Sequence, residues 1–418
     1  MLNGKRIVLG VCGGIAAYKS AVLLRLLVKA GANCRVIMTQ NAREFVGAAT
    51  FAALSGSPVY DEMFGDRNAG AAIRHIAWAE EADAVIVAPA TANIAGKFAG
   101  GIADDVLSTF LLAATCPILI CPSMNTNMLL SPPVQRNLQQ LEKDGHTVLA
   151  PVCGALACGA SGAGRLPEPH EIVDRLLSRL SPCDLAGRTV LITAGPTREA
   201  LDPVRFITNP SSGKMGYALA RAAEHRGARV LLVSGPSGLE VPLNVERIMV
   251  QTAAEMADAV LSRLPDVHAL IKSAAVSDYR PEIVSDHKIK KADDGECLRL
   301  IRTMDILKEA GRRKTDQVLV GFAAETRDLA TYARGKLLSK NLDMIVGNLV
   351  GHPGSGFGAD TNEVVLYHAD GRVEPLPSMS KDAAAHEILD RVSAIMRRRG
   401  GGASAAVSDH TGSRWNRQ

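Results

Sequence analysis

Short apolar runs alternate with helical patterns of apolar positions at the start of the chain. The run Arg6–Val11 ends in two glycines, and a helical pattern follows from Ala16 to Ala30. After a Gly-Ala turn, the next apolar run is Cys34–Met38. A strand, a glycine loop, a helix, a turn and a second strand in this order predict the opening of a parallel, doubly wound α/β domain.

The same order of elements recurs from residue 189. The run Thr189–Thr193 ends at Gly195-Pro196, a helical pattern covers about Gly216 to His225, and Val230–Ser234 follows. Further strands are predicted at Ala84–Ala88, Pro117–Cys121, Ala269–Lys272, Val318–Phe322, Met344–Val346 and Val364–Tyr367. We therefore predict an α/β protein of two doubly wound, Rossmann-like domains with mainly parallel sheets.

Turn residues at Leu180–Gly187 separate the two repeats. We expect domains over residues 1–182 and 187–396. From about Arg397 the sequence is small, polar and aperiodic, so residues 397–418 are predicted to form a disordered tail.

Composition and charge narrow the functional classes. A length of 418 residues suits two or three domains, and a 4 % aromatic content suits α/β layers better than a β-sandwich. The net charge of +4 is too mild for a nucleic-acid surface but is compatible with small anionic substrates. Eight scattered cysteines, no zinc-finger spacing and no visible leader at Met1–Arg6 favour reduced thiols and a cytoplasmic location. The longest apolar run, Phe110–Cys121, is too short to span a membrane.

The loop Cys12–Ile15 has the small residues that let backbone N–H groups approach a phosphate at a helix N-terminus. A tight strand-to-helix turn would explain the same residues. The spacing is not G-x-G-x-x-G, and the second strand ends in Met38-Thr39-Gln40 without an acidic residue to hold a ribose. A dinucleotide is therefore disfavoured as the ligand of this loop, and the phosphate of a mononucleotide remains a candidate.

Other polar residues follow predicted strands or begin helices. Ala88–Asn93 has hydroxyl and amide groups suited to a flavin phosphate or ribityl chain, and Asn125 follows the next strand. His75 stands at a helix start, and Cys158 lies in the glycine-rich loop Cys153–Arg165. Each residue alone has an ordinary explanation as a turn, a helix cap or buried filler.

In combination and in this order, these motifs resemble the FMN-dependent phosphopantothenoylcysteine decarboxylases. The resemblance rests on Gly13–Lys19, His75-Ile76, Pro89–Asn93, Pro122–Asn125 and Ala157–Gly159. Leu129 stands where the family usually has an aromatic residue, which concerns local packing. The resemblance implies a flavodoxin-like fold.

The resemblance also implies roles for individual residues. His75 would act as the acid/base group, Asn125 would hold the substrate carboxylate, and Cys158 would protonate the late intermediate. The thiol of the substrate's cysteine would be oxidised by the flavin to a thioaldehyde, which provides an electron sink for loss of CO₂. The reduced flavin would then return the electrons, so the cycle is redox-neutral. The residues implied to contact FMN are Gly13, Gly14, Ile15, Thr39, Ala90, Thr91, Asn93 and Ser108, and those implied to contact substrate are Met124 and Asn125.

The second half carries one loop and two lysine clusters suited to anions. Asn209–Gly216 departs from a Walker A motif, with Thr208 in place of the first Gly and Met215 in place of Ser/Thr, yet it can cradle anions at a helix start. Lys288 and Lys290 would share one side of an extended segment. Lys336 and Lys340 would share a helix face, although solvated surface lysines would give the same pattern.

These motifs resemble the bacterial phosphopantothenate–cysteine ligases. The matching segments are Ala194–Glu199, Leu201–Arg205, Asn209, Ser211–Gly216, Ala274–Tyr279, Lys288–Lys291, Gly321–Thr326 and Lys340-Asn341. The two resemblances cover about residues 5–395, in the order of the fused bacterial enzyme. They imply a multifunctional enzyme of coenzyme A biosynthesis, both ligase and lyase.

The ligase family uses CTP to activate the carboxylate of 4′-phosphopantothenate as an acyl-cytidylate, and cysteine then displaces CMP. The resemblance implies that Asn209 assists conversion of the acyl-cytidylate and that Ser211, Ser212, Gly213 and Lys214 bind substrate. Asp278, Lys288, Phe322, Lys336 and Lys340 would contact CTP. Mg²⁺ or Mn²⁺ should bridge the triphosphate, with no protein ligand identified. The choice of CTP over ATP rests on the resemblance.

Two other functional classes remain as alternatives. A regulatory flavoprotein without activity is disfavoured because His75 and Cys158 are both present. A nicotinamide oxidoreductase is disfavoured by the missing dinucleotide fingerprints. The family further implies a homo-oligomer, with decarboxylase trimers in a dodecamer and ligase dimers, and no nucleic-acid or membrane partner.

Overall fold

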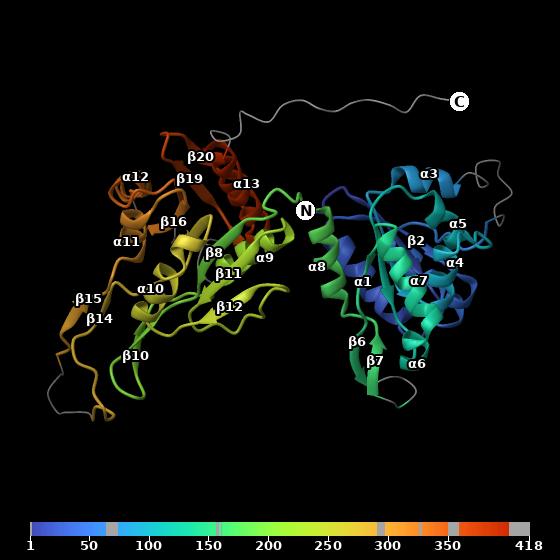
Figure 1. Ribbon diagram of the computed structural model, residues 1–418, viewed down its shortest axis with the longest axis horizontal. Coiled ribbons are helices and arrows are strands. Elements are labelled where there is room, and N and C mark those ends of the chain that lie inside the picture. Colours follow the sequence, from blue (N-terminus) through green and yellow to red (C-terminus); the bar gives the residue numbers. More distant parts are fainter. Residues whose placement is uncertain are drawn as a thin grey trace. The chain divides into compact units, whose positions relative to one another are not determined.

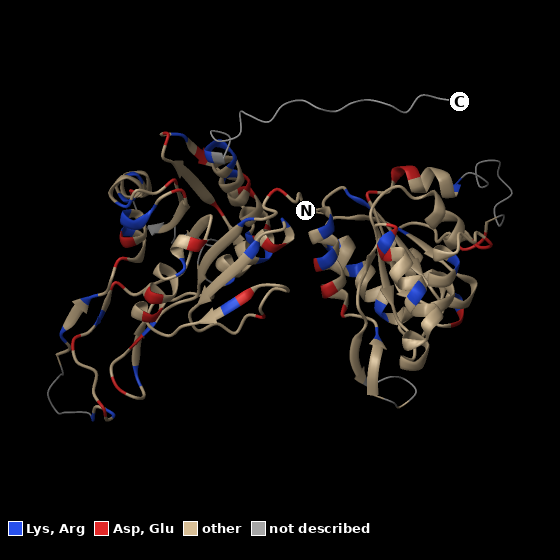
Figure 2. Ribbon diagram, in the orientation of Figure 1, with Lys and Arg blue, Asp and Glu red and all other residues tan. Residues whose placement is uncertain are grey.

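The computed structural model describes residues 2–63, 74–155, 159, 161–290, 297–325, 328–349 and 359–400. The chain divides into two compact units, Met1–Ser181 and Pro182–Gln418 (Figure 1). In both units basic and acidic residues are interspersed along the ribbon (Figure 2). No helix among the described residues is long and apolar enough to cross a membrane.

The first unit is built on a five-stranded parallel sheet of order β2-β1-β3-β4-β5. Its central strands are buried on both faces, which explains why they are continuous apolar runs in the sequence. The order is that of flavodoxin-like folds, as predicted. The strands are β1 Arg6–Val11, β2 Asn33–Met38, β3 Ala84–Ala90, β4 Ile118–Pro122 and β5 Thr147–Val148.

Helices cover both faces of this sheet. Leu24 of α1 and Ile172 of α8 belong to the apolar core on one face, and Leu107 of α5 and Leu138 of α7 belong to the core on the other. An antiparallel ribbon, β6 Val152–Ala155 with β7 Ser161–Arg165, lies apart from the sheet. The helices are α1 Ala17–Lys29, η1 Gln40–Glu44, α2 Ala48–Ser55, α3 Arg74–Glu81, α4 Ala92–Ala99, α5 Val106–Ala113, α6 Thr126–Leu130, α7 Pro132–Lys143 and α8 Pro169–Leu180.

The second unit has an eight-stranded sheet of order β12-β11-β8-β13-β16-β17-β19-β20. The first six strands are parallel, and β19 and β20 pair antiparallel at one edge. The parallel strands follow the 3-2-1-4-5-6 order of Rossmann folds. The strands are β8 Thr189–Ala194, β11 Arg229–Ser234, β12 Glu246–Met249, β13 Ala269–Lys272, β16 Val318–Glu325, β17 Met344–Leu349, β19 Val364–His368 and β20 Val373–Pro375.

The helices of this unit also divide between the two faces of its sheet. Helices α9 and α13 pack against one face, and α10, α11 and α12 against the other. The fold class predicted from the sequence is confirmed. The bounds are α9 Lys214–His225, α10 Ala253–Leu261, η3 Leu264–Asp266, α11 Ile306–Arg313, α12 Leu329–Ser339 and α13 Lys381–Gly400.

The last helix extends beyond the point where the sequence predicts a disordered tail. Helix α13 continues to Gly400, and its Arg399 pairs with Asp343 at the start of β17. The prediction of a disordered tail is therefore wrong for residues 397–400, which are helical. Their composition resembles a tail, but Arg399 has a carboxylate partner far away in the sequence. Residues 401–418 lie outside the described residues.

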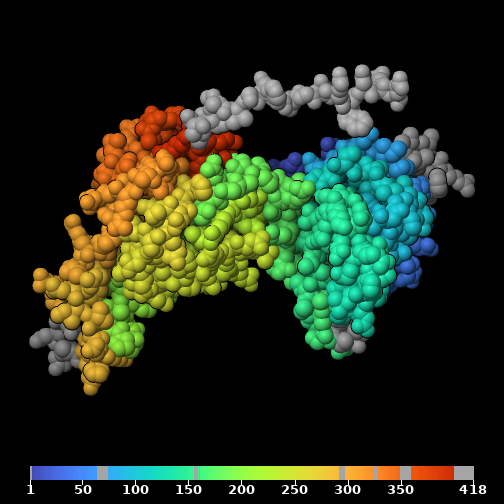
Figure 3. Space-filling model, in the orientation of Figure 1, coloured from blue at the N-terminus to red at the C-terminus, as the bar shows by residue number. Residues whose placement is uncertain are grey.

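Among the described residues of the second unit, three small ribbons accompany the main sheet. Two of them, β9–β10 and β14–β15, contact each other and project from the main sheet (Figures 1 and 3). Their strands are β9 Arg198–Ala200, β10 Phe206–Thr208, β14 Tyr279–Pro281 and β15 Leu300–Arg302; the third ribbon pairs β18 Thr361–Asn362 with β21 Met379–Ser380.

Candidate functional site

In the first unit, the carboxyl ends of β1 and β3 frame a cavity of about 560 Å³. This is the switch point of the strand order, where ligands bind in such sheets. The predicted residues that line it are Gly13, Gly14, Ile15, Thr91, Met124 and Asn125. The structure therefore brings together six of the predicted flavin and substrate contacts.

The two glycines of this loop have different surroundings. A Cβ at Gly13 would stand 2.5 Å from Cβ of Asn41 and 2.7 Å from its carbonyl carbon, so only glycine lets the two backbones approach so closely. A Cβ at Gly14 would have only Cγ2 of Thr91 nearby, at 4.0 Å. Gly13 is therefore required by packing, and Gly14 leaves open space toward the cavity.

Two polar residues of the cavity cap helices. Thr91 accepts a hydrogen bond from the backbone N–H of Ile94 at the start of α4. Asn125 is exposed, and its Oδ1 accepts one from the backbone N–H of Asn127 at 2.8 Å at the start of α6. Among the other predicted contacts, Ala90 is buried within β3 and Asn93 is exposed on α4.

A second cavity, of about 520 Å³, is lined by Thr39, His75, Asp104 and Asp105. His75 lies in the first turn of α3, the helix start that the sequence predicts, and its buried Nδ1 has no hydrogen-bond partner among the described residues. Lys97 binds both carboxylates, at 2.6 Å from Asp104 and 2.7 Å from Asp105. Within one chain, His75 and Asn125 thus line different cavities.

Ser108 lines neither cavity and is fully buried. Its backbone N–H donates to Asp105 at 2.8 Å, and its hydroxyl accepts from the backbone N–H of Asp105 at 3.1 Å, which forms a capping box at the start of α5. Burial acts to raise the pKa of Asp105, but Lys97 and Ser108 outweigh it and lower that pKa. Cys158, the predicted proton donor, lies outside the described residues.

In the second unit, the loop from Asn209 leads into α9. Gly213 takes a positive φ of 78° at the helix N-cap, and its N–H donates to Ser211 Oγ at 3.3 Å. The amide of Asn209 donates to the backbone carbonyl of Val276 at 3.0 Å, in the loop after β13. Because β8 and β13 are neighbours at the switch point, Asn209 is held at the position where this fold binds ligands.

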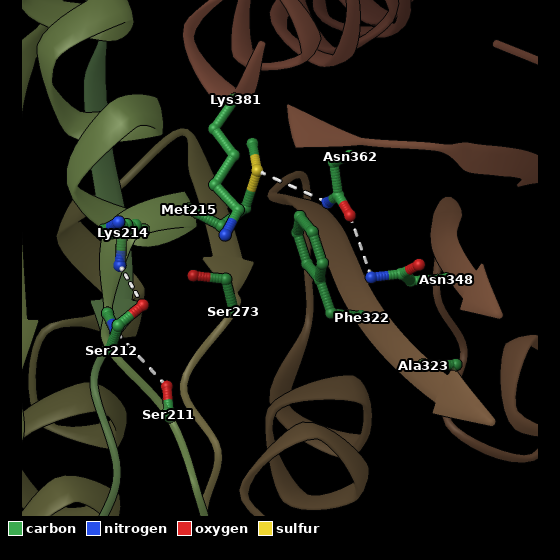
Figure 4. A pocket seen from close by; sticks show the side chains of 12 residues that line it. Ser211, Ser212, Lys214, Met215, Ser273, Phe322, Ala323, Asn348, Asn362 and Lys381 are labelled. Carbon is green, nitrogen blue, oxygen red and sulfur yellow. Dashed lines mark hydrogen bonds between the residues drawn. The ribbon is translucent and has the colours of Figure 1, made fainter. Parts of the chain in front are cut away.

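A cavity of about 80 Å³ lies beside this loop (Figure 4). It is lined by the predicted residues Ser211, Ser212, Gly213, Lys214 and Phe322 and by others that the sequence did not indicate, Ser273, Asn348, Asn362 and Lys381. Asn348 donates to Asn362 at 2.9 Å, and Lys214 pairs with Asp360 at 2.6 Å. Burial first, and then the charge of Lys214, lowers the pKa of Lys381.

On the other face of the same sheet, a charged cluster surrounds Lys272, the last residue of β13. Its charged neighbours are Lys340, Asp305, Asp278 and Lys336. Lys340 pairs with Asp305, the N-cap of α11, at 2.8 Å. Burial, followed by the charge of Lys340, lowers the pKa of Lys272 to about 8. Three predicted CTP contacts therefore meet around a lysine that sequence reasoning missed, although a lysine ending an apolar strand was a usable signal.

Lys288 lies on an exposed segment without regular secondary structure. No ion pair joins Lys288 to the cluster around Lys272 in the part of the chain that the structure describes. Lys291 and Thr326, from the matching motifs, lie outside the described residues.

Two family models match the chain along its two units. The model described as Flavoprotein matches residues 1–181, and the model described as DNA/pantothenate metabolism flavoprotein C-terminal domain matches residues 185–396. The coenzyme A biosynthesis bifunctional protein CoaBC of Bacillus subtilis (strain 168) is 52 % identical over 404 residues, 96 % of this chain and 99 % of the relative. The chain belongs to the family of bifunctional coenzyme A biosynthesis proteins. The predicted fusion of a decarboxylase with a ligase is thereby confirmed.

A second CoaBC protein matches the chain over a similar length, and a solved structure matches about half of the chain. The Vibrio cholerae serotype O1 protein of this name is 47 % identical over 391 residues, 93 % of this chain and 98 % of the relative. A crystal structure of the C-terminal domain of a CoaBC protein is 45 % identical, with a TM-score of 0.45, and covers 51 % of this chain and 98 % of that one.

Proposed function

We propose that this chain converts 4′-phosphopantothenate and cysteine to 4′-phosphopantetheine in two steps. Residues 187–396 would form the ligase and residues 1–182 the decarboxylase. The observation that carries the proposal is that each unit has its own sheet, with a cavity at the carboxyl ends of its strands that is lined by part of the candidate residues of that unit. Both units also match their family models over nearly their full length.

The ligase step activates a carboxylate, which is a poor acyl donor. The 4′-phosphopantothenate carboxylate attacks the α-phosphate of CTP, pyrophosphate leaves, and an acyl-cytidylate forms. The cysteine amine then attacks the acyl carbon, CMP leaves and the amine loses a proton. Lys272, Lys336 and Lys340 would neutralise the phosphates, and Asn209, fixed through Val276, would orient the acyl group. Phe322 would line the nucleotide site, and Mg²⁺ or Mn²⁺ would bridge the triphosphate.

The decarboxylase step requires FMN, and the residues of the first cavity fit it. The Gly13–Ile15 loop leads into α1, and the open space beside Gly14 lets backbone N–H groups approach the flavin phosphate. FMN, when bound, supplies a hydride acceptor that later returns the electrons. Asn125, exposed at the cavity, would hold the substrate carboxylate. The Nδ1 of His75, which has no hydrogen-bond partner in the part of the chain that the structure describes, would exchange a proton. Cys158 would protonate the late, decarboxylated intermediate.

We also propose that the enzyme is a cytoplasmic homo-oligomer, with decarboxylase trimers in a dodecamer and ligase dimers. Support comes from large apolar side chains exposed on each unit, such as Ile15 and Leu130 in the first and Ile283 and Val284 in the second. His75 and Asn125 line separate cavities in one chain, which favours a decarboxylase site completed by a second copy.

Mass spectrometry of a reaction with purified protein, 4′-phosphopantothenate, cysteine, CTP and Mg²⁺ tests this function. We expect 4′-phosphopantetheine and CMP. In Cys158→Ser, 4′-phosphopantetheine should not form, and the oxidised, decarboxylated intermediate that Cys158 would protonate should accumulate instead, whereas the control Cys183→Ser, at an exposed cysteine, should behave like wild type. If neither product forms with added FMN, nor with ATP in place of CTP, the enzymatic proposal is wrong and a regulatory flavoprotein becomes the better explanation.

A further inference from the structure

We propose that Asp202 is a positioning residue of the ligase, holding the segment that carries Lys288. Asp202 lies in the turn between β9 and β10, and Lys288 lies in the excursion between β14 and β15. The inference rests on the proposed function in one respect, namely that Lys288 contacts CTP. The anchoring itself is observed directly.

The carboxylate of Asp202 is fully buried and divides its two oxygens between two segments. Oδ1 accepts hydrogen bonds from the backbone N–H groups of Val204 at 2.7 Å and Arg205 at 2.8 Å, which closes its own turn. Oδ2 accepts one from the backbone N–H of Ile289 at 3.1 Å. The guanidinium of Arg205 stands 3.7 Å from Oδ2. A buried carboxylate needs such donors, so Asp202 joins the two segments strongly.

A second hydrogen bond fastens the same segment a few residues earlier. The backbone N–H of Ser285 donates to the carbonyl of Leu201 at 3.0 Å. The hydroxyl of Ser285 in turn donates to the carbonyl of His287 at 2.7 Å, which shapes the chain just before Lys288. The segment is thus tied to the Asp202 turn on both sides of Lys288.

The anchor leaves the lysines free to face a ligand. Ile289 points its amide at Asp202 and is partly buried, while Lys288 and Lys290 on either side are exposed. Neither lysine has an ion pair with any described residue. Holding this irregular segment in one conformation reduces the ordering cost of bringing an ammonium group to a phosphate. Asp202 itself is buried, so it acts through Lys288 rather than by touching CTP.

Asp202→Asn tests the anchor with a minimal change. The amide oxygen can still accept from Val204 and Arg205, but its NH₂ group cannot accept from Ile289. We expect trypsin to cleave after Lys288 and Lys290 about tenfold faster, and KM for CTP to rise about tenfold with little change in kcat. The control Glu282→Gln removes a surface pair with Arg299 in the same excursion and should change neither quantity. Ile289→Pro removes the donor instead of the acceptor, so it should raise KM for CTP and speed cleavage after Lys290 even if Asp202→Asn folds poorly; cleavage after Lys288 is not read in this variant, because trypsin does not cut a Lys–Pro bond.

A double variant distinguishes positioning from a general structural role. Added to Lys288→Ala, Asp202→Asn should raise KM for CTP no further, while cleavage after Lys290 still increases. Unchanged trypsin cleavage after Lys290 in both Asp202→Asn and Ile289→Pro would refute the anchor. Faster cleavage with unchanged KM for CTP, or full additivity with Lys288→Ala, would refute the positioning role. If the wild-type protein makes no ligase product, the proposed function fails, and trypsin cleavage still decides whether the anchor exists.

Discussion

Arg226 and Asp184 form a buried two-point ion pair in the second unit. Nε of Arg226 donates to Oδ1 of Asp184 at 2.8 Å, and Nη2 donates to Oδ2 at 2.6 Å. Nη1 of the same guanidinium reaches Asp390 on α13 at 2.7 Å. The side chain of Arg226 is only 2 % exposed. This one residue therefore ties the segment before β8 and helix α13 to the end of α9.

Arg226→Met should destabilise the second unit strongly. It leaves the carboxylate of Asp184 without its partner, and loss of one member of a buried pair costs about 3–5 kcal/mol. Arg221→Met is the matched control on the same helix, because Arg221 pairs with Asp382 at 3.2 Å at the surface, where such pairs contribute about 0–1 kcal/mol. Urea denaturation followed by circular dichroism measures both. Equal effects of the two variants would contradict this account.

His386 should make the second unit sensitive to acid. Burial first, and then the charges of Arg226 and His225, lowers the pKa of His386 to about 4. The unfolded chain takes up the proton near pH 6.5, so it binds more protons than the folded chain between about pH 6.5 and 4, and stability falls as the pH drops through that window. The loss should be roughly 2 kcal/mol because partial exposure screens the effect.

His386→Gln should flatten the dependence of the melting temperature on pH in this window. His287→Gln, at an exposed histidine of the same unit, should leave it unchanged. A separate loss of stability below about pH 4 should remain in both variants, because the pKa of Asp184 is lowered by Arg226 although burial opposes this. A wild-type melting temperature that stays constant from pH 6.5 to 4 would disprove the assignment.

Lys272 should contribute to CTP binding in a pH-dependent way. Its pKa of about 8 means that the ammonium loses its charge as the pH rises from 7 to 9. CTP affinity should therefore weaken over this range, and Lys272→Met should weaken it about tenfold to a hundredfold at pH 7. Lys272→Arg keeps its charge and should lose less affinity at pH 9. Calorimetric titration with CTP measures each value.

The control for Lys272 is Lys308→Met. Lys308 is an exposed lysine on α11, and its backbone N–H donates a hydrogen bond to Asp305, the N-cap of that helix. The side chain of Lys308 is outside the cluster, so CTP affinity should stay at the wild-type value. If Lys272→Met binds CTP as tightly as Lys308→Met does, the cluster is not a phosphate site.

Substitutions at the two loop glycines should separate packing from flavin binding. Gly13→Ala forces a Cβ against the backbone of Asn41, so both melting temperature and bound flavin should fall. Gly14→Ala meets almost nothing in the protein, so the melting temperature should hold while the flavin content drops. Visible absorbance of the purified proteins reports the flavin. Full flavin content in Gly14→Ala would argue against phosphate binding at this loop.

Local patterns in the sequence were sufficient for the fold. Strands such as β3 and β8 are continuous apolar runs because both of their faces are buried, and the glycine at 13 marks a loop where two backbones meet. The gathering of Gly14, Thr91 and Asn125 then follows from a parallel sheet, since the strands carrying them end at the same edge.

Contacts between segments that are distant in the sequence could not be predicted from local sequence patterns. Lys381 reaches the α9 loop only because α13 packs beside α9, and no spacing rule links the two segments. Asp305 and Asp202 look like ordinary turn residues until the fold brings Lys340 and Ile289 to them. The role of Ser108 could have been predicted from local sequence. Asp105, three residues before it, is a typical helix N-cap, and a capping role for Ser108 competes with the implied flavin contact.

The hydrogen bond between Asp202 and residue 289 is made to the main chain, so it does not depend on which side chain stands there. Any amino acid with a backbone N–H can serve, and proline alone cannot. A saturation library at position 289 should therefore tolerate broad substitution with one sharp gap, whereas a library at position 202 should accept little besides aspartate. The acceptor and the donor of this one hydrogen bond would thus differ in the substitutions that they tolerate, few at position 202 and many at position 289.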